Sequence, residues 1–197
     1  MKLSCLRPLA ALLLTLGLAA CGGKASYDVS GSISNLNTNG LILANGGEEL
    51  PIAAGQTSFT FKKRIDYGTD YNISFKQQPA HMTCGISGGS GPAGHYINIS
   101  AAVSCSQNAY SVGGTITGLT VEGLVLINGS ATTTVAKDAK TFTMVGPVAD
   151  GATYNVSVSD ASTTQTKGLL CVVQPGTGAG TMGSANVTTV QIACNPV

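Results

Sequence analysis

Two histidines and six cysteines are the residues of this chain best suited to metal binding or nucleophilic chemistry. His81 lies three residues before Cys84, and imidazole and thiolate are both zinc ligands. The competing interpretation is that Cys84 belongs to a disulfide beside an exposed turn histidine, because an oxidised sulfur cannot act as a thiolate ligand. Neither His81 nor His95 has a histidine counterpart in the repeat described below. We favour the disulfide and predict no metal site and no other cofactor.

The other patterns that could carry chemistry do not indicate catalysis. We find no arrangement of Ser, His and Asp that is typical of a hydrolase triad. Glycine-rich stretches at 88–94 and 176–180 have the composition of phosphate-binding loops, but no helical pattern follows either of them. The helix N-terminus that would bind the phosphate is therefore missing. We interpret both stretches as hairpin connections and predict that the protein is not an enzyme.

A basic cluster is formed by Lys62, Lys63 and Arg64. The simpler interpretation is a solvated strand end or turn, with Asp66 and Asp70 partly cancelling the local field. The alternative is contact with an anionic ligand such as the phosphates of lipopolysaccharide, because basic side chains form strong hydrogen bonds with phosphate. The chain carries a formal net charge of only +1, so we expect no nucleic-acid partner.

The N-terminus has the pattern of an export signal. Lys2 and Arg7 lie before an apolar run over residues 9–20. A helix that crosses a bilayer needs about 20 apolar residues, so this run is too short to span one. A basic start, a short apolar segment and small residues at its end are typical of a signal peptide.

The apolar run ends in Leu-Ala-Ala-Cys at residues 18–21, which resembles the lipobox of bacterial lipoproteins. The resemblance implies that residues 1–20 are removed and that Cys21 carries the lipid, palmitate included, so that the membrane becomes a partner of the protein. Gly22, where an Asp would imply retention at the inner membrane, implies the cell outer membrane, with the surface or periplasmic face left open. The alternative is an ordinary signal peptide followed by a chance cysteine.

The rest of the chain contains one module in two copies. YDVSGSISNLNTNGLILANG at 27–46 returns as YSVGGTITGLTVEGLVLING at 110–129, displaced by about 83 residues. GTDYNISF at 68–75 returns as GATYNVSV at 151–158. The predicted divisions are a signal peptide (1–20), a lipidated tether (21–26), the first module (27–105), a linker (106–109) and the second module (110–197).

Hydrophobic residues within each copy recur with a period of two. Tyr71, Ile73 and Phe75 flank polar residues, as Tyr154 and Val156 do in the second copy. Such alternation is typical of a half-buried strand, and Asn-Gly and Asp-Gly dipeptides mark turns between the runs. We therefore predict an all-β fold of two tandem antiparallel β-sandwiches, with six or seven short strands each.

The cysteines agree with two modules. Cys5 lies in the signal and Cys21 is the predicted lipid site, so four cysteines remain and three connectivities are possible. The duplication favours one disulfide within each copy, and an exported chain meets a compartment in which disulfides persist. The predicted disulfides are Cys84–Cys105 and Cys171–Cys194.

The order of the sequence motifs within each copy resembles that of Ig-like or transthyretin-like modules of bacterial surface proteins. It runs V-x-G-x-I, then Gly-Leu-x-Leu, then Gly-x-x-Tyr, and covers nearly all of residues 27–194. Together with the lipobox it implies a structural or adhesive protein of the cell envelope that contacts an unidentified envelope or extracellular macromolecule. The alternative is a binding module for a glycan, lipopolysaccharide or small ligand, or an accessory subunit of an envelope complex.

Overall fold

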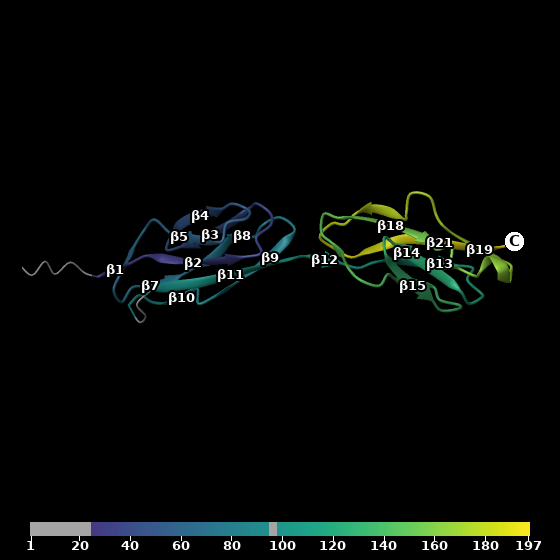
Figure 1. Cartoon of the computed structure of the whole chain (residues 1–197), viewed down its shortest axis with the longest axis horizontal. Coiled ribbons are helices and arrows are strands. Elements are labelled where there is room, and N and C mark those ends of the chain that lie inside the picture. The colour runs from purple at the N-terminus through teal and green to yellow at the C-terminus, as the bar shows by residue number, and fades with distance from the viewer. Residues whose placement is uncertain (1–24, 95–97) are drawn as a thin grey trace, which may run out of the picture.

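The computed structural model describes residues 25–94 and 98–197 and contains two β-sheet modules placed end to end along one long axis (Figure 1). The first module comprises strands β1 to β11 and the second comprises β12 to β21. The predicted all-β sandwich fold is confirmed. The predicted lipid site, Cys21, and the second histidine, His95, lie outside the described residues.

The first module is built from two main sheets. One has the strand order β5-β2-β11-β9 and the other β4-β3-β8, and two short pairs, β1-β6 and β10-β7, extend them. Its strands are β1 (Ser26–Tyr27), β2 (Val29–Ser34), β3 (Leu41–Asn45), β4 (Glu48–Ile52), β5 (Ser58–Thr60), β6 (Ile65–Asp66), β7 (Asp70–Asn72), β8 (Ser74–Gln77), β9 (Met82–Ser87), β10 (Ser90–Pro92) and β11 (Ile99–Gln107).

The second module repeats this topology with ten strands in place of eleven, and both numbers exceed the predicted six or seven because short two- and three-residue strands are included. Its sheets are β16-β13-β21-β19 and β15-β14-β18-β20, with the short pair β12-β17, and β18 replaces the interrupted β7 and β8 of the first module. Its strands are β12 (Ala109–Tyr110), β13 (Val112–Thr117), β14 (Leu124–Asn128), β15 (Ala131–Val135), β16 (Thr141–Thr143), β17 (Val148–Ala149), β18 (Thr153–Val158), β19 (Leu169–Val173), β20 (Ala179–Thr181) and β21 (Val187–Pro196).

One helical element accompanies the strands of the described part, the 3-10 helix η1 (Gln165–Lys167). Across residues 25–94 and 98–197, we find no helix with the length and apolar character that a membrane crossing requires.

The first and last long strands of each module are parallel neighbours, which corrects the antiparallel prediction at this one pair. β2 pairs with β11 in parallel from Val29↔Ile99 to Ser34↔Ser104, and β13 pairs with β21 in the same direction. The other strand pairs in the described residues are antiparallel. Alternation predicts which face of a strand is buried, but it contains no information on the direction of the neighbouring strand.

Glycine is required where these parallel strands approach each other. A Cβ atom on Gly31 would overlap the carbonyl oxygen of Ala101, and one on Gly114, its equivalent, would overlap the backbone of Val190. Glycine in a strand interior often marks such a close backbone approach. The duplicated glycine is therefore a packing requirement of the module.

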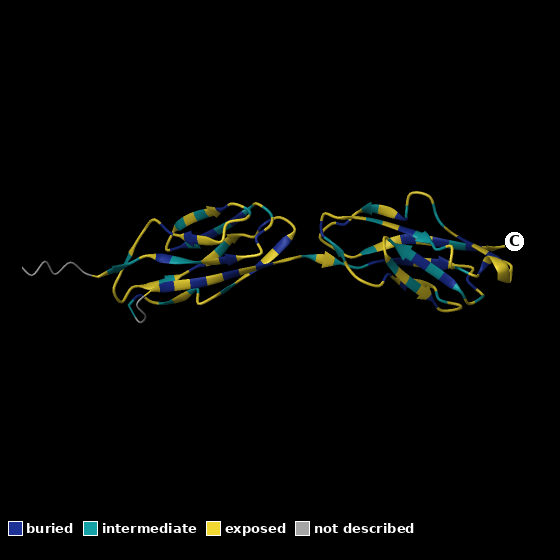
Figure 2. Ribbon diagram, in the orientation of Figure 1, coloured by how far each residue is buried: buried dark blue, intermediate teal, exposed yellow. Residues whose placement is uncertain are grey.

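Each module has its own hydrophobic core, formed by the inward residues of alternating strands (Figure 2). In β11 buried and exposed residues alternate almost without exception. The residues buried in the first core include Val29, Ile33, Leu36, Leu41, Leu43, Phe59, Phe61 and Ile73, and those buried in the second include Val112, Ile116, Leu119, Leu124, Leu126, Phe142, Met144 and Val156. The two sets are the same repeat positions, so the duplicated pattern is a core pattern.

The two predicted disulfides are present in the structure. Cys84 on β9 lies directly opposite Cys105 on β11, and Cys171 on β19 lies opposite Cys194 on β21. All four cysteines are buried. Each bridge therefore joins the edge strand of a sheet to the central strand that ends its module.

Candidate functional site

The basic cluster lies on the connection between β5 and β6, and acidic side chains are interleaved with it. The carboxylate of Glu48 accepts hydrogen bonds from the backbone N–H groups of Lys62 and Lys63, at 2.7 and 2.9 Å. Arg64 forms an ion pair with Asp28, with Nε 2.9 Å from Oδ1, and its Nη2 donates to the carbonyl oxygen of Ser26 at 2.7 Å. The three predicted residues are thus exposed together, but the guanidinium already has a partner.

Glu48→Gln is expected to flatten the acid side of the pH–stability profile of the first module. The N–H groups of Lys62 and then Lys63 hold the pKa of the Glu48 carboxyl below its ordinary value. A carboxylate with a lowered pKa stabilises the fold above the pKa of an unfolded glutamate, about 4.3, and this contribution is lost as the pH falls through the folded pKa. Urea unfolding between neutral and acid pH measures the difference, and parallel curves for wild type and variant would contradict it.

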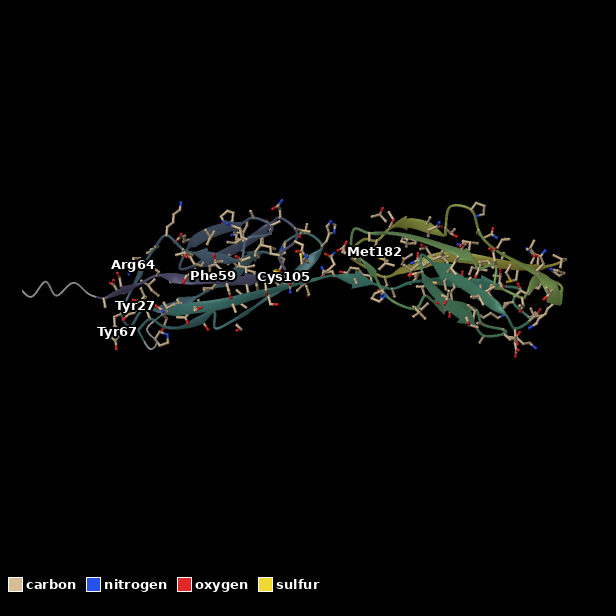
Figure 3. All side chains as sticks on the ribbon, in the orientation of Figure 1. Tyr27, Phe59, Arg64, Tyr67, Cys105 and Met182 are labelled. Carbon is tan, nitrogen blue, oxygen red and sulfur yellow. A yellow bond between two sulfur atoms is a disulfide. The ribbon has the colours of Figure 1, made fainter. Side chains whose placement is uncertain are left out.

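The cluster belongs to the end of the first module at which the described chain begins. We call this the proximal end, formed by β1, β6 and the turn from Tyr67 to Thr69. Figure 3 shows Arg64, Tyr27 and Tyr67 gathered there, beside the start of the chain. The ring centroids of Tyr27 and Tyr67 are 6.5 Å apart. Tyr67 is 66% exposed, which is uncommon for so large an aromatic side chain.

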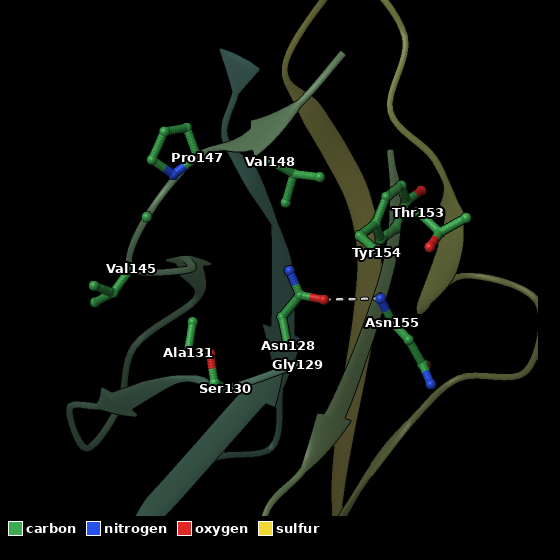
Figure 4. Close-up of a pocket in the computed structure, with 11 residues that line it drawn as sticks. Asn128, Gly129, Ser130, Ala131, Val145, Pro147, Val148, Thr153, Tyr154 and Asn155 are labelled. Carbon is green, nitrogen blue, oxygen red and sulfur yellow. Dashed lines mark hydrogen bonds between the residues drawn. The ribbon is translucent and has the colours of Figure 1, made fainter. Parts of the chain in front are cut away.

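An open groove occurs at the same repeat position in both modules. In the second module it has a volume of about 520 Å³ and is lined by the β14–β15 turn, residues 145–148 and the start of β18 (Figure 4). In the first module the equivalent groove has a volume of about 280 Å³. Its lining includes Lys63, Arg64, Asp66 and Asp70, whereas the lining of the second groove contains no charged side chain.

The asparagine of the Asn-Gly turn supports both grooves. The N–H of Asn155 donates to Oδ1 of Asn128 at 2.8 Å (Figure 4), and the N–H of Asn72 donates to Oδ1 of Asn45 at 3.0 Å. The sequence identifies both dipeptides as turns but does not show that the side chain reaches across to the next strand. The recurrence of asparagine at the same position in both copies is the signal that could have indicated it.

His81 has a role that the sequence did not suggest. Its Nδ1 lies 2.9 Å from Oδ1 of Asp150, a residue of the second module. The Asp150 side chain is only 7% exposed, whereas that of His81 is 50% exposed. His81 adopts a left-handed backbone conformation (φ 62°), as does its counterpart Gly168 (φ 81°). The predicted turn histidine therefore links the two modules.

Backbone and amide groups complete this junction. The N–H of Asn108 donates to the carbonyl of His81 at 3.0 Å. The carbonyl of Asn108 accepts a hydrogen bond from the N–H of Asp150 at 2.9 Å. The side-chain amide of Gln107 donates to the carbonyl of Asp150 at 3.1 Å. The linker is therefore hydrogen-bonded to both modules. Met182 lies at the end of the second module that faces the first (Figure 3).

The double variant His81→Gly, Gln107→Ala is expected to increase the motion of one module relative to the other. It removes two hydrogen bonds of about 1 kcal/mol each, while glycine keeps the left-handed conformation available at position 81. Nuclear magnetic resonance relaxation should show one common tumbling time for the wild type and separate times for the variant. Identical relaxation, with both modules folded, would mean that the junction does not depend on these side chains.

The metal interpretation of Cys84 is excluded because its sulfur is bonded to Cys105. In the described part of the chain, no group of three or more His, Cys, Asp or Glu side chains is placed to hold a metal ion. The two glycine-rich stretches were predicted to be hairpin connections, but β10 (Ser90–Pro92) lies within the first and β20 (Ala179–Thr181) begins within the second. Each stretch therefore contributes strand residues as well as a turn.

One further motif spans residues 85–89. Gly-Ile-Ser-Gly-Gly has the spacing of the nucleophile elbow of α/β-hydrolases. That elbow requires a strand, a sharp turn and then a helix. Here Ser87 ends β9 and the chain continues into β10, so the required context is absent.

Comparisons with known proteins assign no family. No protein-family model matches the chain, and no curated protein matches it in sequence. Among solved structures, the major pilin protein T3.2 from Streptococcus pyogenes serotype GAS13637 is 11% identical with a TM-score of 0.32, covering 88% of this chain and 97% of its own. A streptococcal ancillary pilin is 14% identical with a TM-score of 0.28, covering 87% of this chain and 63% of its own.

Proposed function

We propose that this chain is a lipid-anchored, non-enzymatic protein of the bacterial cell envelope, with a structural or adhesive role. The observation that carries the proposal is the junction, in which the linker and the pair His81–Asp150 hold two modules end to end. Such an arrangement keeps the second module at a fixed distance from the point of attachment. A rod of this kind acts as a spacer that presents its far module to a partner.

The N-terminal sequence supports the anchor. The lipobox-like residues place Cys21 only four residues before Ala25, where the described chain begins. A buried methylene group contributes about 0.8 kcal/mol to membrane binding, and two or more acyl chains hold a protein stably. A diacylglycerol thioether on Cys21 would therefore keep the first module at the membrane of the envelope.

The lipid anchor is tested by Cys21→Ser, with Cys5→Ser as the matched control inside the predicted signal peptide. We expect wild type and the control to appear in the membrane fraction with an intact mass that includes the lipid. The Cys21→Ser protein should lose the lipid mass and leave the membrane fraction. Normal processing and membrane retention of Cys21→Ser would refute the anchor.

The adhesive role is tested by orientation on intact cells. Cleavage of the protein by an externally added protease, with a periplasmic protein as the protected control, is the expected result. Complete protection would exclude surface adhesion and restrict the proposal to a structural role in the periplasm.

A binding module for a glycan, lipopolysaccharide or small ligand is the second candidate function, and the groove of the second module favours it. That groove is neutral and lined by amide, hydroxyl and tyrosine side chains together with the apolar residues Ala131, Val145, Pro147 and Val148. A glycan array with wild type and Val145→Arg, which adds a charge at a 63% exposed groove residue, tests this second function.

A lipopolysaccharide pull-down with the variant Lys62→Ser, Lys63→Ser, Arg64→Ser tests the basic cluster. If neither the Val145 substitution nor the triple substitution alters binding, or if no binding is detected, the groove and the basic cluster are rejected as binding sites.

A further inference from the structure

The proximal end of the first module differs from the matching end of the second in a way that indicates what each one faces. Tyr67 and Arg64 occupy the repeat positions of Asp150 and Pro147. Asp150 is buried and meets His81 of the preceding module. Tyr67 is exposed, and no module precedes it in the described chain.

The path of the chain fixes Tyr67 beside the exit toward Cys21. The N–H of Tyr67 donates to the carbonyl of Ala25 at 2.8 Å. Arg64 donates to the carbonyl of Ser26 at 2.7 Å, and β1 pairs with β6 next to it. The first described residues are thus bound to the same structure that carries the exposed tyrosine.

The distance from the predicted lipid to this end is short. Four residue steps separate Cys21 from Ala25, and a fully extended chain covers at most about 14 Å in that length. The headgroup region on each side of a bilayer is itself about 5–8 Å thick. If Cys21 carries the lipid, the proximal end cannot move away from the headgroups by more than about one headgroup layer.

The side chains of the proximal end suit that environment. Tyrosine is enriched at membrane–water interfaces, since its ring is apolar and its hydroxyl is polar. Lys62 and Lys63 add positive charge, and in the described residues no ion pair joins either ammonium group to an acid. Asp66 and Asp70 lie close by, the Glu48 carboxylate contacts the backbone N–H groups of both lysines, and the charges of Arg64 and Asp28 offset each other. The net field is therefore small, and tyrosine and the short tether carry most of the effect.

We propose that the proximal end docks against the phospholipid headgroups of the membrane that holds the anchor, with Tyr67 at the interface and Lys62 and Lys63 facing phosphates. This inference rests on the proposed lipid anchor and adds an orientation to it. The occupant is a phospholipid surface, because the tether length allows no other large body between this end and the bilayer.

The absence of tryptophan from the chain makes a direct test possible. Tyr67→Trp introduces a single tryptophan at the proximal end, and Val145→Trp introduces one at a similarly exposed position, 63% against 66%, in the second module. Both full-length lipidated proteins are reconstituted into vesicles of phosphatidylethanolamine and phosphatidylglycerol, and into vesicles of phosphatidylcholine alone. The measurements are the emission wavelength and quenching by iodide in water.

We expect the emission of Tyr67→Trp to shift to the blue on reconstitution and its iodide quenching to fall several-fold, while Val145→Trp changes in neither respect. Adding Lys62→Ser and Lys63→Ser should reduce this protection in the vesicles with phosphatidylglycerol and leave it unchanged in phosphatidylcholine. An equal effect in both vesicles would overturn the role of the lysines.

Two outcomes separate this inference from the anchor on which it rests. A Tyr67→Trp protein that carries the lipid, floats with the vesicles and is quenched as strongly as Val145→Trp would overturn the docking and leave the anchor standing. A protein without lipid on Cys21 by intact mass would overturn both. Because Tyr67 is exposed, its replacement is expected to leave the circular dichroism spectrum unchanged.

Discussion

Gly114→Ala is expected to destabilise the second module by about 3 kcal/mol. The added Cβ would overlap the carbonyl group and Cα of Val190, which are backbone atoms of the adjacent parallel strand and cannot rotate away. The strands would have to separate at the centre of the sheet, where β13 and β21 already change register between Val112 and Gly114. A core can relax around a side chain more easily than around a displaced backbone.

Gly183→Ala is the matched control, since a Cβ there would meet no atom within 4 Å and its φ lies outside the left-handed region. Its stability should equal that of the wild type or exceed it slightly, because alanine restricts the unfolded chain. Denaturant unfolding of the full chain measures both variants. Equal stability of Gly114→Ala and Gly183→Ala would show that the parallel pair is not as closely packed as described.

Removal of one disulfide is expected to lower the stability of its own module by about 3 kcal/mol. Cys171 and Cys194 are separated by 23 residues, and their bridge restricts that loop in the unfolded chain. A domain of this size has only about 5–15 kcal/mol of stability in total, so the loss is a large fraction. Cys171→Ala with Cys194→Ala also avoids leaving a lone reactive thiol.

Calorimetry of the full chain distinguishes the two modules. In the double variant, the melting temperature of the second module should fall by about 10–20 °C, while that of the first stays in place. Cys84→Ala with Cys105→Ala should give the reciprocal result, because the first bridge spans 21 residues. Two unchanged transitions would mean that the bridges do not stabilise the modules.

The all-β fold and both disulfides could be predicted because their signals are local or repeated. Alternation over a few residues identifies a buried face, and two copies of one pattern limit the plausible cysteine pairings. The direction of β11 relative to β2 could not be predicted in this way, since it depends on the route of the whole chain. Gly31 and Gly114, small residues in the middle of both first strands, were the available clue.

The surface sites were less predictable, since each one joins residues that are distant in sequence. The cluster at Lys62 was expected at an exposed turn, but the sequence does not show that Glu48 reaches its backbone N–H groups. The contact between His81 and Asp150 spans 69 residues and two modules. His81 lies at a position where the other copy has glycine, and such a break in a repeat is informative only once the neighbouring module is placed.

The parallel pairing of β2 with β11 also determines how the protein bears mechanical load. β2 is the first long strand of the module and β11 is its last, so a force that separates the two ends of the module pulls these adjacent strands in opposite directions along their length. Their hydrogen bonds are then loaded together in shear rather than opened one after another. The bridge at Cys84 and Cys105 further limits how much chain can extend after rupture. The strand order of each module therefore resists stretching along the axis on which the two modules are joined.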